Sequence, residues 1–132
     1  MPRVLIIDDE EDIRDVICEI LSRAGFEVDV ASTGDDGIEK LRSKPADVIV
    51  TDIIMPGKDG VVTITEIRKE FPDAKIIAIS GGGNFGSIAY EPNAIKTSAY
   101  LAAADEAGAD VTLPKPFDRE ALMEAVRALS AD

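Results

Sequence analysis

The chain has 132 residues, with 14 Lys and Arg against 26 Asp and Glu, so its formal net charge is −12. This length predicts one domain with a core of its own and no room for a second domain. An acidic chain without a basic block is not expected to bind nucleic acid or anionic membranes. Its apolar runs are too short to span a bilayer and its start has no signal-peptide pattern, so we expect a cytoplasmic protein.

The chain contains no histidine and a single cysteine, Cys18. The lack of histidine excludes Ser-His triads, His-based zinc sites and a phosphohistidine on this chain. Cys18 lies within a helical apolar pattern, and we expect it to be a buried free thiol. Any phosphoryl group that the chain accepts is therefore expected to come from a donor outside it.

The first part of the chain alternates strand and helix patterns. The apolar run 4–7 predicts a strand. The next pattern predicts a helix that Gly25 ends, with an apolar stripe made of Ile13, Val16, Ile17, Ile20 and Leu21. Residues 27–30 alternate acidic and apolar side chains, which is typical of a strand exposed on one face. A brief helix around 38–41 must end before Pro45.

The remaining segments continue this alternation. Residues 47–52 have too little polarity for a solvent-facing side, which predicts a strand buried on both faces. The Pro- and Gly-rich turn 55–60 leads to another helix, and further strands are predicted at 75–80 and 111–113. Asp118 can cap a last helix, whose buried residues are Leu122, Val126 and Leu129. The order predicts an α/β fold, a five-stranded parallel sheet with helices on both faces.

Several predicted strands end at residues that can bind a phosphoryl group or the cation that accompanies it. Asp8 and Asp9 follow the first strand, Asp52 ends the strand 47–52, and Ser80 and Lys115 stand at the ends of the last two. Because the carboxyl ends of parallel strands share one edge of a sheet, we expect these groups in one cleft. Three carboxylates, a hydroxyl and an ammonium suit a divalent cation together with a phosphoryl group.

Some of these acidic residues could serve the structure alone and have no role in binding. An Asp-Asp pair after a strand is common as a turn or helix cap, so Asp8 and Asp9 alone leave both interpretations open. Asp52 is harder to explain structurally, because burying an unpaired charge costs several kcal/mol or more. Glu10 and Glu11 are expected to be solvated surface residues.

At these strand ends the chain resembles the receiver domain of bacterial response regulators. The matching motifs extend over nearly the whole chain and comprise Leu5–Glu10 (LIIDDE), Asp52–Pro56 (DIIMP) with Asp59-Gly60, Ile79–Gly81 (ISG), Ala107–Asp110 (AGAD) and Leu113–Phe117 (LPKPF). The resemblance implies a flavodoxin-like (CheY-like) fold with strand order 2-1-3-4-5. It also implies a stand-alone receiver over residues 1–132, without an output domain.

The resemblance further implies the roles of the acidic residues. Asp52 would be the phosphoacceptor. Asp9 and Asp52, together with the backbone carbonyl of Ile54, would bind Mg²⁺, and Asp8 would act largely through water.

By the same resemblance, the last two strand ends would bind the phosphoryl group. Ser80 and Lys115 would contact it, and Gly81 offers an amide that no side chain obstructs. The Lys115-Pro116 peptide would be cis, which is uncommon elsewhere. The implied partners are a sensor histidine kinase or histidine phosphotransferase and a downstream protein target.

Two features depart from the family pattern. Thr112 occupies the position of the usual aromatic switch residue, three positions before the lysine. A long inserted loop at about 81–96 follows Ser80, and we expect this loop to change on phosphorylation in place of the missing aromatic ring.

Two alternatives remain at this point. Phosphatases of the haloacid dehalogenase type also use an aspartate nucleophile and Mg²⁺, but they need a second aspartate two positions later, where this chain has Ile54. The other alternative is a pseudo-receiver that binds partners without phosphate, against which the complete set of acidic, hydroxyl and lysine positions argues. The expected protein is therefore a binding module, with no enzymatic activity beyond its own phosphorylation and hydrolysis.

Overall fold

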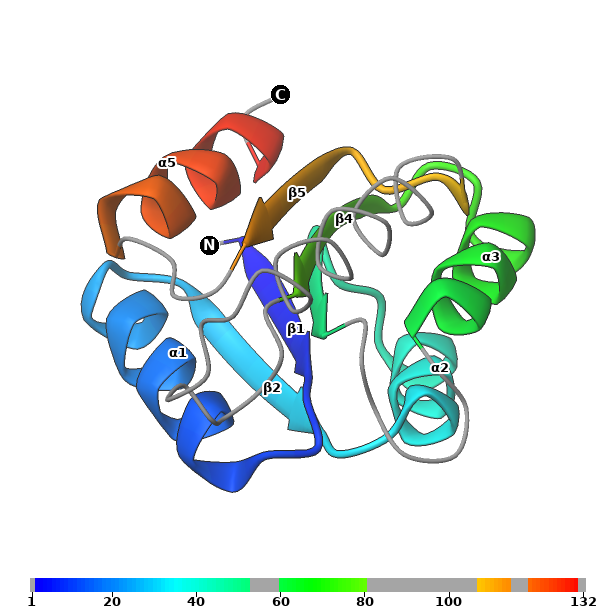
Figure 1. Cartoon of the computed structure of the whole chain (residues 1–132), viewed down its shortest axis with the longest axis horizontal. Helices are drawn as coiled ribbons and strands as arrows, with labels where there is room; N and C mark the ends of the chain where they lie inside the picture. Colours follow the sequence, from blue (N-terminus) through cyan, green and yellow to red (C-terminus); the bar gives the residue numbers. More distant parts are fainter. Residues whose placement is uncertain (1, 53–59, 81–106, 115–118, 131–132) are drawn as a thin grey trace, which may run out of the picture.

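The sheet has the predicted parallel architecture (Figure 1). The computed structural model describes residues 2–52, 60–80, 107–114 and 119–130. Its strands are β1 (Arg3–Ile7), β2 (Glu27–Ala31), β3 (Val48–Asp52), β4 (Lys75–Ser80) and β5 (Val111–Pro114). They pair in parallel in the order β2-β1-β3-β4-β5, which confirms the predicted fold class and strand order.

Helices cover both faces of this sheet. They are α1 (Glu11–Arg23), α2 (Gly34–Ser43), α3 (Gly60–Glu70) and α5 (Arg119–Ser130). In Figure 1, α1 and α5 lie on one face and α2 and α3 on the other. In the part of the chain that the structure describes, no helix is long and apolar enough to cross a membrane. The predicted loop 81–96 and the predicted helix cap Asp118 lie outside the described residues.

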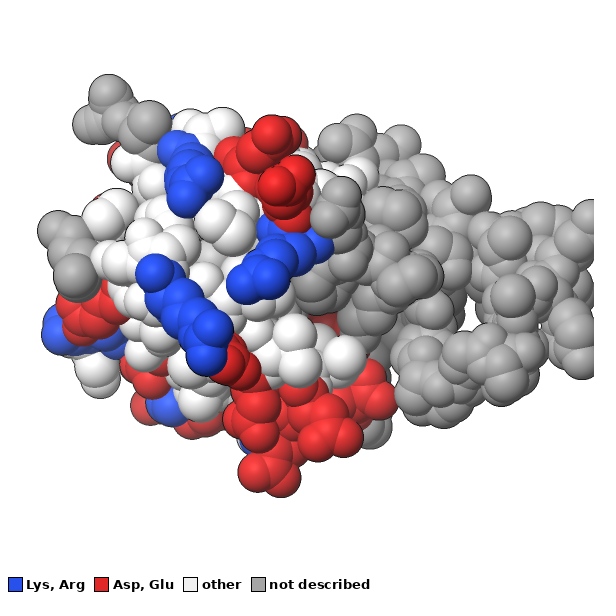
Figure 2. Space-filling model, turned by 90° about the vertical axis from the view of Figure 1, so that its left-hand side faces the viewer, with Lys and Arg blue, Asp and Glu red and all other residues white. Residues whose placement is uncertain are grey.

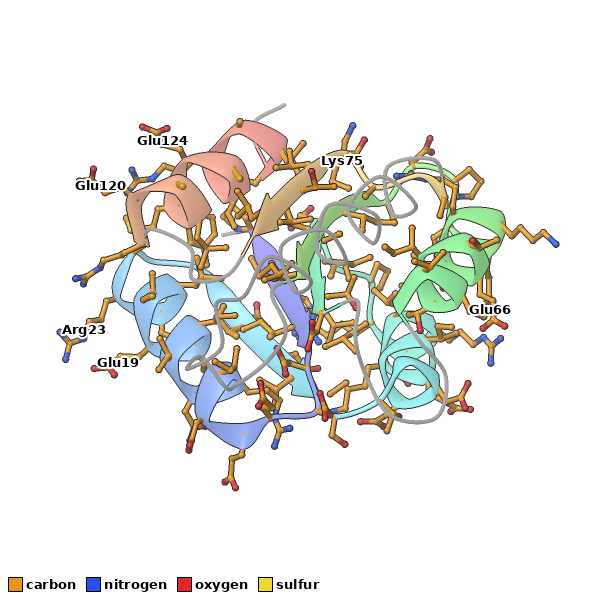
Figure 3. All side chains as sticks on the ribbon, viewed as in Figure 1. Glu19, Arg23, Glu66, Lys75, Glu120 and Glu124 are labelled. Atoms are coloured by element: carbon orange, nitrogen blue, oxygen red, sulfur yellow. The ribbon has the colours of Figure 1, made fainter. Side chains whose placement is uncertain are left out.

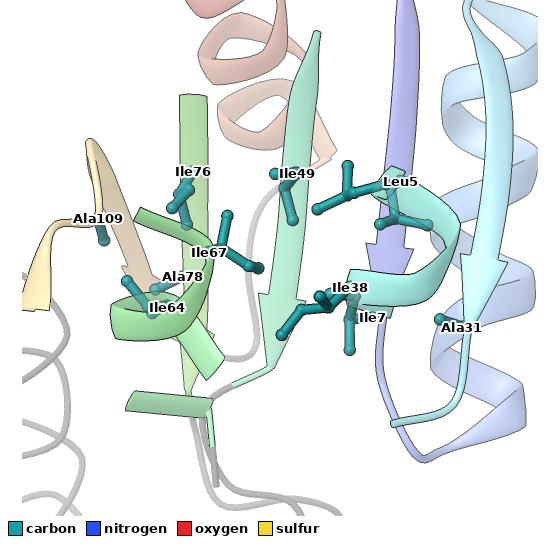
Figure 4. Close-up of a cluster of buried hydrophobic side chains, with 11 residues drawn as sticks. Leu5, Ile7, Ala31, Ile38, Ile49, Ile64, Ile67, Ile76, Ala78 and Ala109 are labelled. Atoms are coloured by element: carbon teal, nitrogen blue, oxygen red, sulfur yellow. The ribbon is translucent and has the colours of Figure 1, made fainter. Parts of the chain in front are cut away.

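The strands bury alternate side chains in two separate apolar clusters. Leu5 and Ile7 of β1 belong to the cluster under α2 and α3, which Figure 4 shows, whereas Val4 and Ile6 belong to the cluster under α1 and α5. Successive side chains of a strand point to opposite faces, so a strand between two helical layers must be apolar throughout. The strand β3 is buried at every residue, as predicted.

Only the centre of the apolar stripe on α1 faces the sheet. Ile17 and Leu21 are fully buried, but Val16 at the margin of the stripe is 51% exposed. Cys18 is half-buried, with its Sγ 3.9 Å from the Ser22 hydroxyl, and not buried as predicted. A stripe of this width exceeds what one sheet contact covers, so its edges stay near solvent.

Four charged residues on α1 and α5 point into solvent. Figure 3 shows Glu19 and Arg23 on α1 and Glu120 and Glu124 on α5 directed away from the sheet. Glu19 and Arg23 form an ion pair of 2.8 Å at the (i, i+4) spacing. Such exposed pairs contribute little to stability, so the apolar faces are what hold these helices on the sheet.

Candidate functional site

The carboxyl ends of β1 and β3 bring two buried aspartates together. Asp8 directly follows β1, and Asp52 is the last residue of β3. These strands are neighbours, with Ile7 paired with Thr51, so the next residue on each strand lies at the same edge. Asp8 is 2% exposed and Asp52 is 5% exposed. The predicted burial of Asp52 is therefore confirmed.

A third carboxylate joins these two. One carboxylate oxygen each from Asp8, Glu10 and Asp52 lies within 4.8 Å of the others. Glu10 is half-buried, whereas the sequence interpretation had placed it on the solvated surface. The structure therefore corrects that expectation, and Glu10 is the acidic residue that sequence reasoning missed.

Hydrogen bonds fix the turn that carries this cluster. The main-chain N–H of Asp8 donates to the Ala31 carbonyl at 3.1 Å, which extends the pairing of β1 with β2. The N–H of Glu10 donates to Oδ1 of Asp8 at 2.9 Å, and the Arg14 guanidinium donates to the Asp8 carbonyl at 2.9 Å. Aspartate commonly folds the chain in this way by accepting from an amide two residues later. Asp8 thus anchors the turn as well as the cluster.

Some of the other predicted site residues lie within the residues that the structure describes, and some lie outside them. Asp9 is exposed and is not one of the three clustered carboxylates. The main chain of Ser80 ends β4 opposite Pro114, and Thr112 of β5 is half-buried and pairs with Ala78. The predicted residues outside the described ranges are Ile54, Gly81, Lys115 and Pro116.

Further acidic residues follow the cluster in the chain. Glu11 and Asp12 lie in the first turn of α1 and are exposed. In Figure 2, acidic side chains gather at the lower edge of the molecule. This is the edge where α1 begins in Figure 1. The positive end of the helix dipole favours carboxylates in a first turn. A field of this sign attracts cations toward the edge of the sheet.

The donor set of the cluster fits a hard divalent cation. All three side chains offer carboxylate oxygens, which Mg²⁺ and Ca²⁺ prefer over nitrogen or sulfur. Like charges held this close repel one another, and a cation between them turns the repulsion into attraction. The buried acidic cluster is therefore compatible with a divalent metal site.

Comparison with known proteins identifies the family. The family model of the response regulator receiver domain matches residues 4–127, and the chain belongs to this family. The chain is 34% identical to the chemotaxis protein CheY of Thermotoga maritima over 97% of both chains. A response regulator receiver domain from Clostridium thermocellum superposes with a TM-score of 0.83 at 27% identity, covering 98% of this chain and 94% of that one.

Some relatives are much longer than this chain. A response regulator from Rickettsia bellii, described as NtrX-like, is 40% identical over 74% of this chain, but the match spans only 20% of that protein. The similarity there concerns the receiver part alone. The chain is thus a receiver domain of the response regulators, which are signalling proteins of two-component systems.

Proposed function

We propose that the chain is a phosphoacceptor receiver in which Asp52 takes a phosphoryl group within a two-component system or phosphorelay. The burial of Asp52 beside two other carboxylates is the observation that carries this proposal. Crowded buried carboxylates cost stability, and such sites are common where a function needs them. The family membership supports the same role.

The proposed reaction has one bond formed and one broken. A carboxylate oxygen of Asp52 bonds to phosphorus while the bond between phosphorus and the nitrogen or oxygen of the donor breaks, and the donor keeps that electron pair. Asp9, Asp52 and the Ile54 carbonyl are proposed to hold Mg²⁺, with Asp8 acting largely through water. Bound Mg²⁺ would offset the negative charge of the carboxylates and of the phosphoryl oxygens.

Groups at the ends of the last two strands are proposed to bind the phosphoryl oxygens. The hydroxyl of Ser80, the amide of Gly81 and the ammonium of Lys115 would each donate a hydrogen bond, and Pro116 would shape the peptide after the lysine. The position of Ser80 at the end of β4, on the same sheet edge as Asp52, supports this assignment. A lysine suits this role because it acts on phosphate as a compact positive charge.

The proposed partners follow from the absence of histidine in the chain. A phosphohistidine donor cannot be one of these 132 residues. We propose that the donor is a sensor histidine kinase or a histidine phosphotransferase. The output is proposed to be binding to a downstream protein. Response regulators as a class interact with partners of these kinds.

The proposal excludes general phosphatase turnover for a chemical reason. An aspartyl-phosphate phosphatase uses a second aspartate two positions after the nucleophile as its general acid and base. This chain has Ile54 at that position, which cannot transfer a proton. We therefore expect no hydrolysis of foreign phosphoesters.

Intact-mass measurement after incubation with acetyl phosphate tests the proposal. We expect a phosphate adduct on the wild-type protein with Mg²⁺ and none with excess EDTA. Asp52→Asn should lose the adduct. Asp47→Asn is the matched control, because Asp47 lies just before β3, at the opposite end of that strand, and is exposed. A full adduct on Asp52→Asn would contradict the assignment.

A further inference from the structure

Thr51 is a buried polar residue on β3 that packing alone does not explain. Among the described residues, the buried polar or charged side chains are those of Asp8, Thr51, Asp52 and Thr63. Thr51 is fully buried and directly precedes Asp52 in the strand. A valine has nearly the same shape and would bring no hydroxyl into the interior, where a polar group costs free energy. The hydroxyl of Thr51 therefore needs an explanation of its own.

The hydroxyl of Thr51 donates to the main-chain carbonyl of Asp52 at 3.0 Å. A threonine hydroxyl has one proton to donate, so this bond uses its whole donor capacity. The bond restrains rotation of the Asp52 carbonyl group about the bond between the Cα and carbonyl carbons. The buried hydroxyl thus acts on the main chain of the residue that is proposed to accept phosphate.

The side chains of Thr51 and Asp52 lie on opposite faces of the sheet. Ile49 belongs to the apolar cluster under α2 and α3, whereas Val50 belongs to the cluster under α1 and α5. Because successive side chains alternate along a strand, Thr51 shares the face of Ile49 and Asp52 lies on the other face. The Thr51 hydroxyl therefore does not reach a phosphoryl group on Asp52, and its influence passes through the main chain.

The position of Asp52 at the end of β3 makes this restraint important. Asp52 is paired with Ile79 of β4, and it is the last residue of its strand. The Thr51 hydroxyl adds a restraint on the carbonyl side of Asp52, and the carboxylate branches from the Cα atom that this bond helps to hold. A nucleophile reacts faster when it is kept near the geometry of attack. A narrower range of main-chain positions therefore favours transfer.

We propose that Thr51 is a positioning residue, whose hydroxyl holds the main chain of Asp52 so that the carboxylate is presented to the incoming phosphoryl group. This inference rests on the proposed function, because the presentation of the carboxylate matters to the reaction only if Asp52 accepts phosphate. Thr51 does not contact the donor. Loss of its hydroxyl should therefore slow phosphoryl transfer and leave the binding of the donor unchanged.

Two substitutions separate the hydrogen bond from packing. Thr51→Val keeps the branched shape and loses the hydroxyl, whereas Thr51→Ser keeps the hydroxyl and loses a methyl group. Time courses of intact mass at several acetyl phosphate concentrations, with saturating Mg²⁺, give the limiting rate and the half-saturating concentration. We expect Thr51→Val to lower the limiting rate by about fivefold, as for the loss of one ordinary hydrogen bond, at an unchanged half-saturating concentration. Thr51→Ser should stay within about twofold of the wild type.

Ile49→Val is the matched control for a loss of packing. Ile49 is fully buried on the same strand and the same face, and its replacement removes a methyl group and no side-chain hydrogen bond. Thermal melts should place Ile49→Val and Thr51→Ser below the wild type, because each variant leaves a small cavity. Both should nevertheless accept phosphate at nearly the wild-type rate. A purely structural role of Thr51 would instead make the rate follow the melting temperature.

The outcomes distinguish this inference from the proposed function. A limiting rate of Thr51→Val within about twofold of the wild type would overturn the role of Thr51 and leave the assignment of Asp52 intact. Equal losses in Thr51→Val and Thr51→Ser would also overturn it, since the hydroxyl would then not be the group that matters. A wild-type protein that takes no phosphate at all would end both proposals.

Discussion

Asp52 illustrates how a single residue can oppose stability while it prepares a site. Its carboxylate is nearly inaccessible and shares the end of the sheet with those of Asp8 and Glu10. Like charges in partly buried surroundings repel more strongly than charges in water. Sites of this kind are where stability and function conflict most often.

The variant Asp52→Asn should therefore be more stable than the wild-type protein in EDTA. Removing one of the clustered charges should raise the free energy of unfolding by about 1 kcal/mol, or roughly 4 °C in melting temperature. Thermal unfolding followed by circular dichroism measures this difference. Asp47→Asn, at the opposite end of β3, should give no gain, because Asp47 accepts a hydrogen bond from the Arg3 amide. If Asp52→Asn were less stable than the wild type, repulsion among the clustered carboxylates would not be the main effect of Asp52 on stability.

At the scale of elements, Arg68 connects the end of α3 to the starts of two strands. Its guanidinium donates to the carbonyls of Pro72, Ala74 and Gly108 at 2.6–2.9 Å and contacts the carboxylate of Asp110 at 3.0 Å. Asp110 in turn accepts the Ile76 amide at 2.8 Å. One planar group thus links α3 with the segments that lead into β4 and β5.

Replacement of Arg68 by lysine should cost about 2 kcal/mol or more, although the charge is retained. Lysine has a single ammonium and cannot reach carbonyls on several segments at once. Urea unfolding measures the loss, with Lys69→Ala as the control because Lys69 is the exposed neighbour on the same helix. Equal stability of Arg68→Lys and the wild type would mean that charge, and not the planar geometry, is what matters.

The pair Arg42–Glu70 connects α2 and α3 on the opposite face from α1 and predicts a pH dependence. Two hydrogen bonds of 2.6 and 2.8 Å join the groups, and hydrogen bonding to Arg42 lowers the pKa of Glu70 from its ordinary 4.5. Because the folded state lowers this pKa, the stabilisation is present above pH 4.5 and is lost as the pH falls through the lower value. The effect should be small and should decrease with salt, since the pair is exposed.

A comparison of wild type with Glu70→Gln across this pH range checks the prediction. The variant should be slightly less stable at neutral pH, and the two curves should meet in acid, where Glu70 is protonated. Urea midpoints at low salt are the appropriate measurement. A difference that persists unchanged below the lowered pKa would point to lost packing and not to the ion pair.

At the scale of the whole molecule, the alternation of apolar runs and helical stripes was enough to predict the sheet. The strands β1, β3 and β4 start and end within a residue of the predicted runs, because a strand covered on both faces must be apolar throughout. The buried Asp52 could be predicted for the same reason, as a charge at the end of such a run.

The identity of the third carboxylate could not be predicted in this way. Asp9, Glu10 and Glu11 are consecutive acidic residues after β1, and no periodicity distinguishes them. Which of them turns toward Asp52 depends on the hydrogen bond from the Glu10 amide to Asp8 and on the contact of Arg14. The exposure of Val16 could not be predicted either. The sequence gives the width of an apolar stripe but not how much of that stripe the sheet covers.

Binding of beryllofluoride with Mg²⁺, followed by backbone amide shifts in NMR, tests most directly whether Asp52 is a phosphoacceptor. Beryllofluoride attaches to a carboxylate with the shape of an acyl phosphate. We predict large shifts at Asp8, Glu10 and Asp52, little change at Asp47 and Lys75 near the amino ends of β3 and β4, and no response in Asp52→Asn. Equal shifts in Asp52→Asn, or shifts confined to the amino ends of the strands, would contradict the assignment of Asp52.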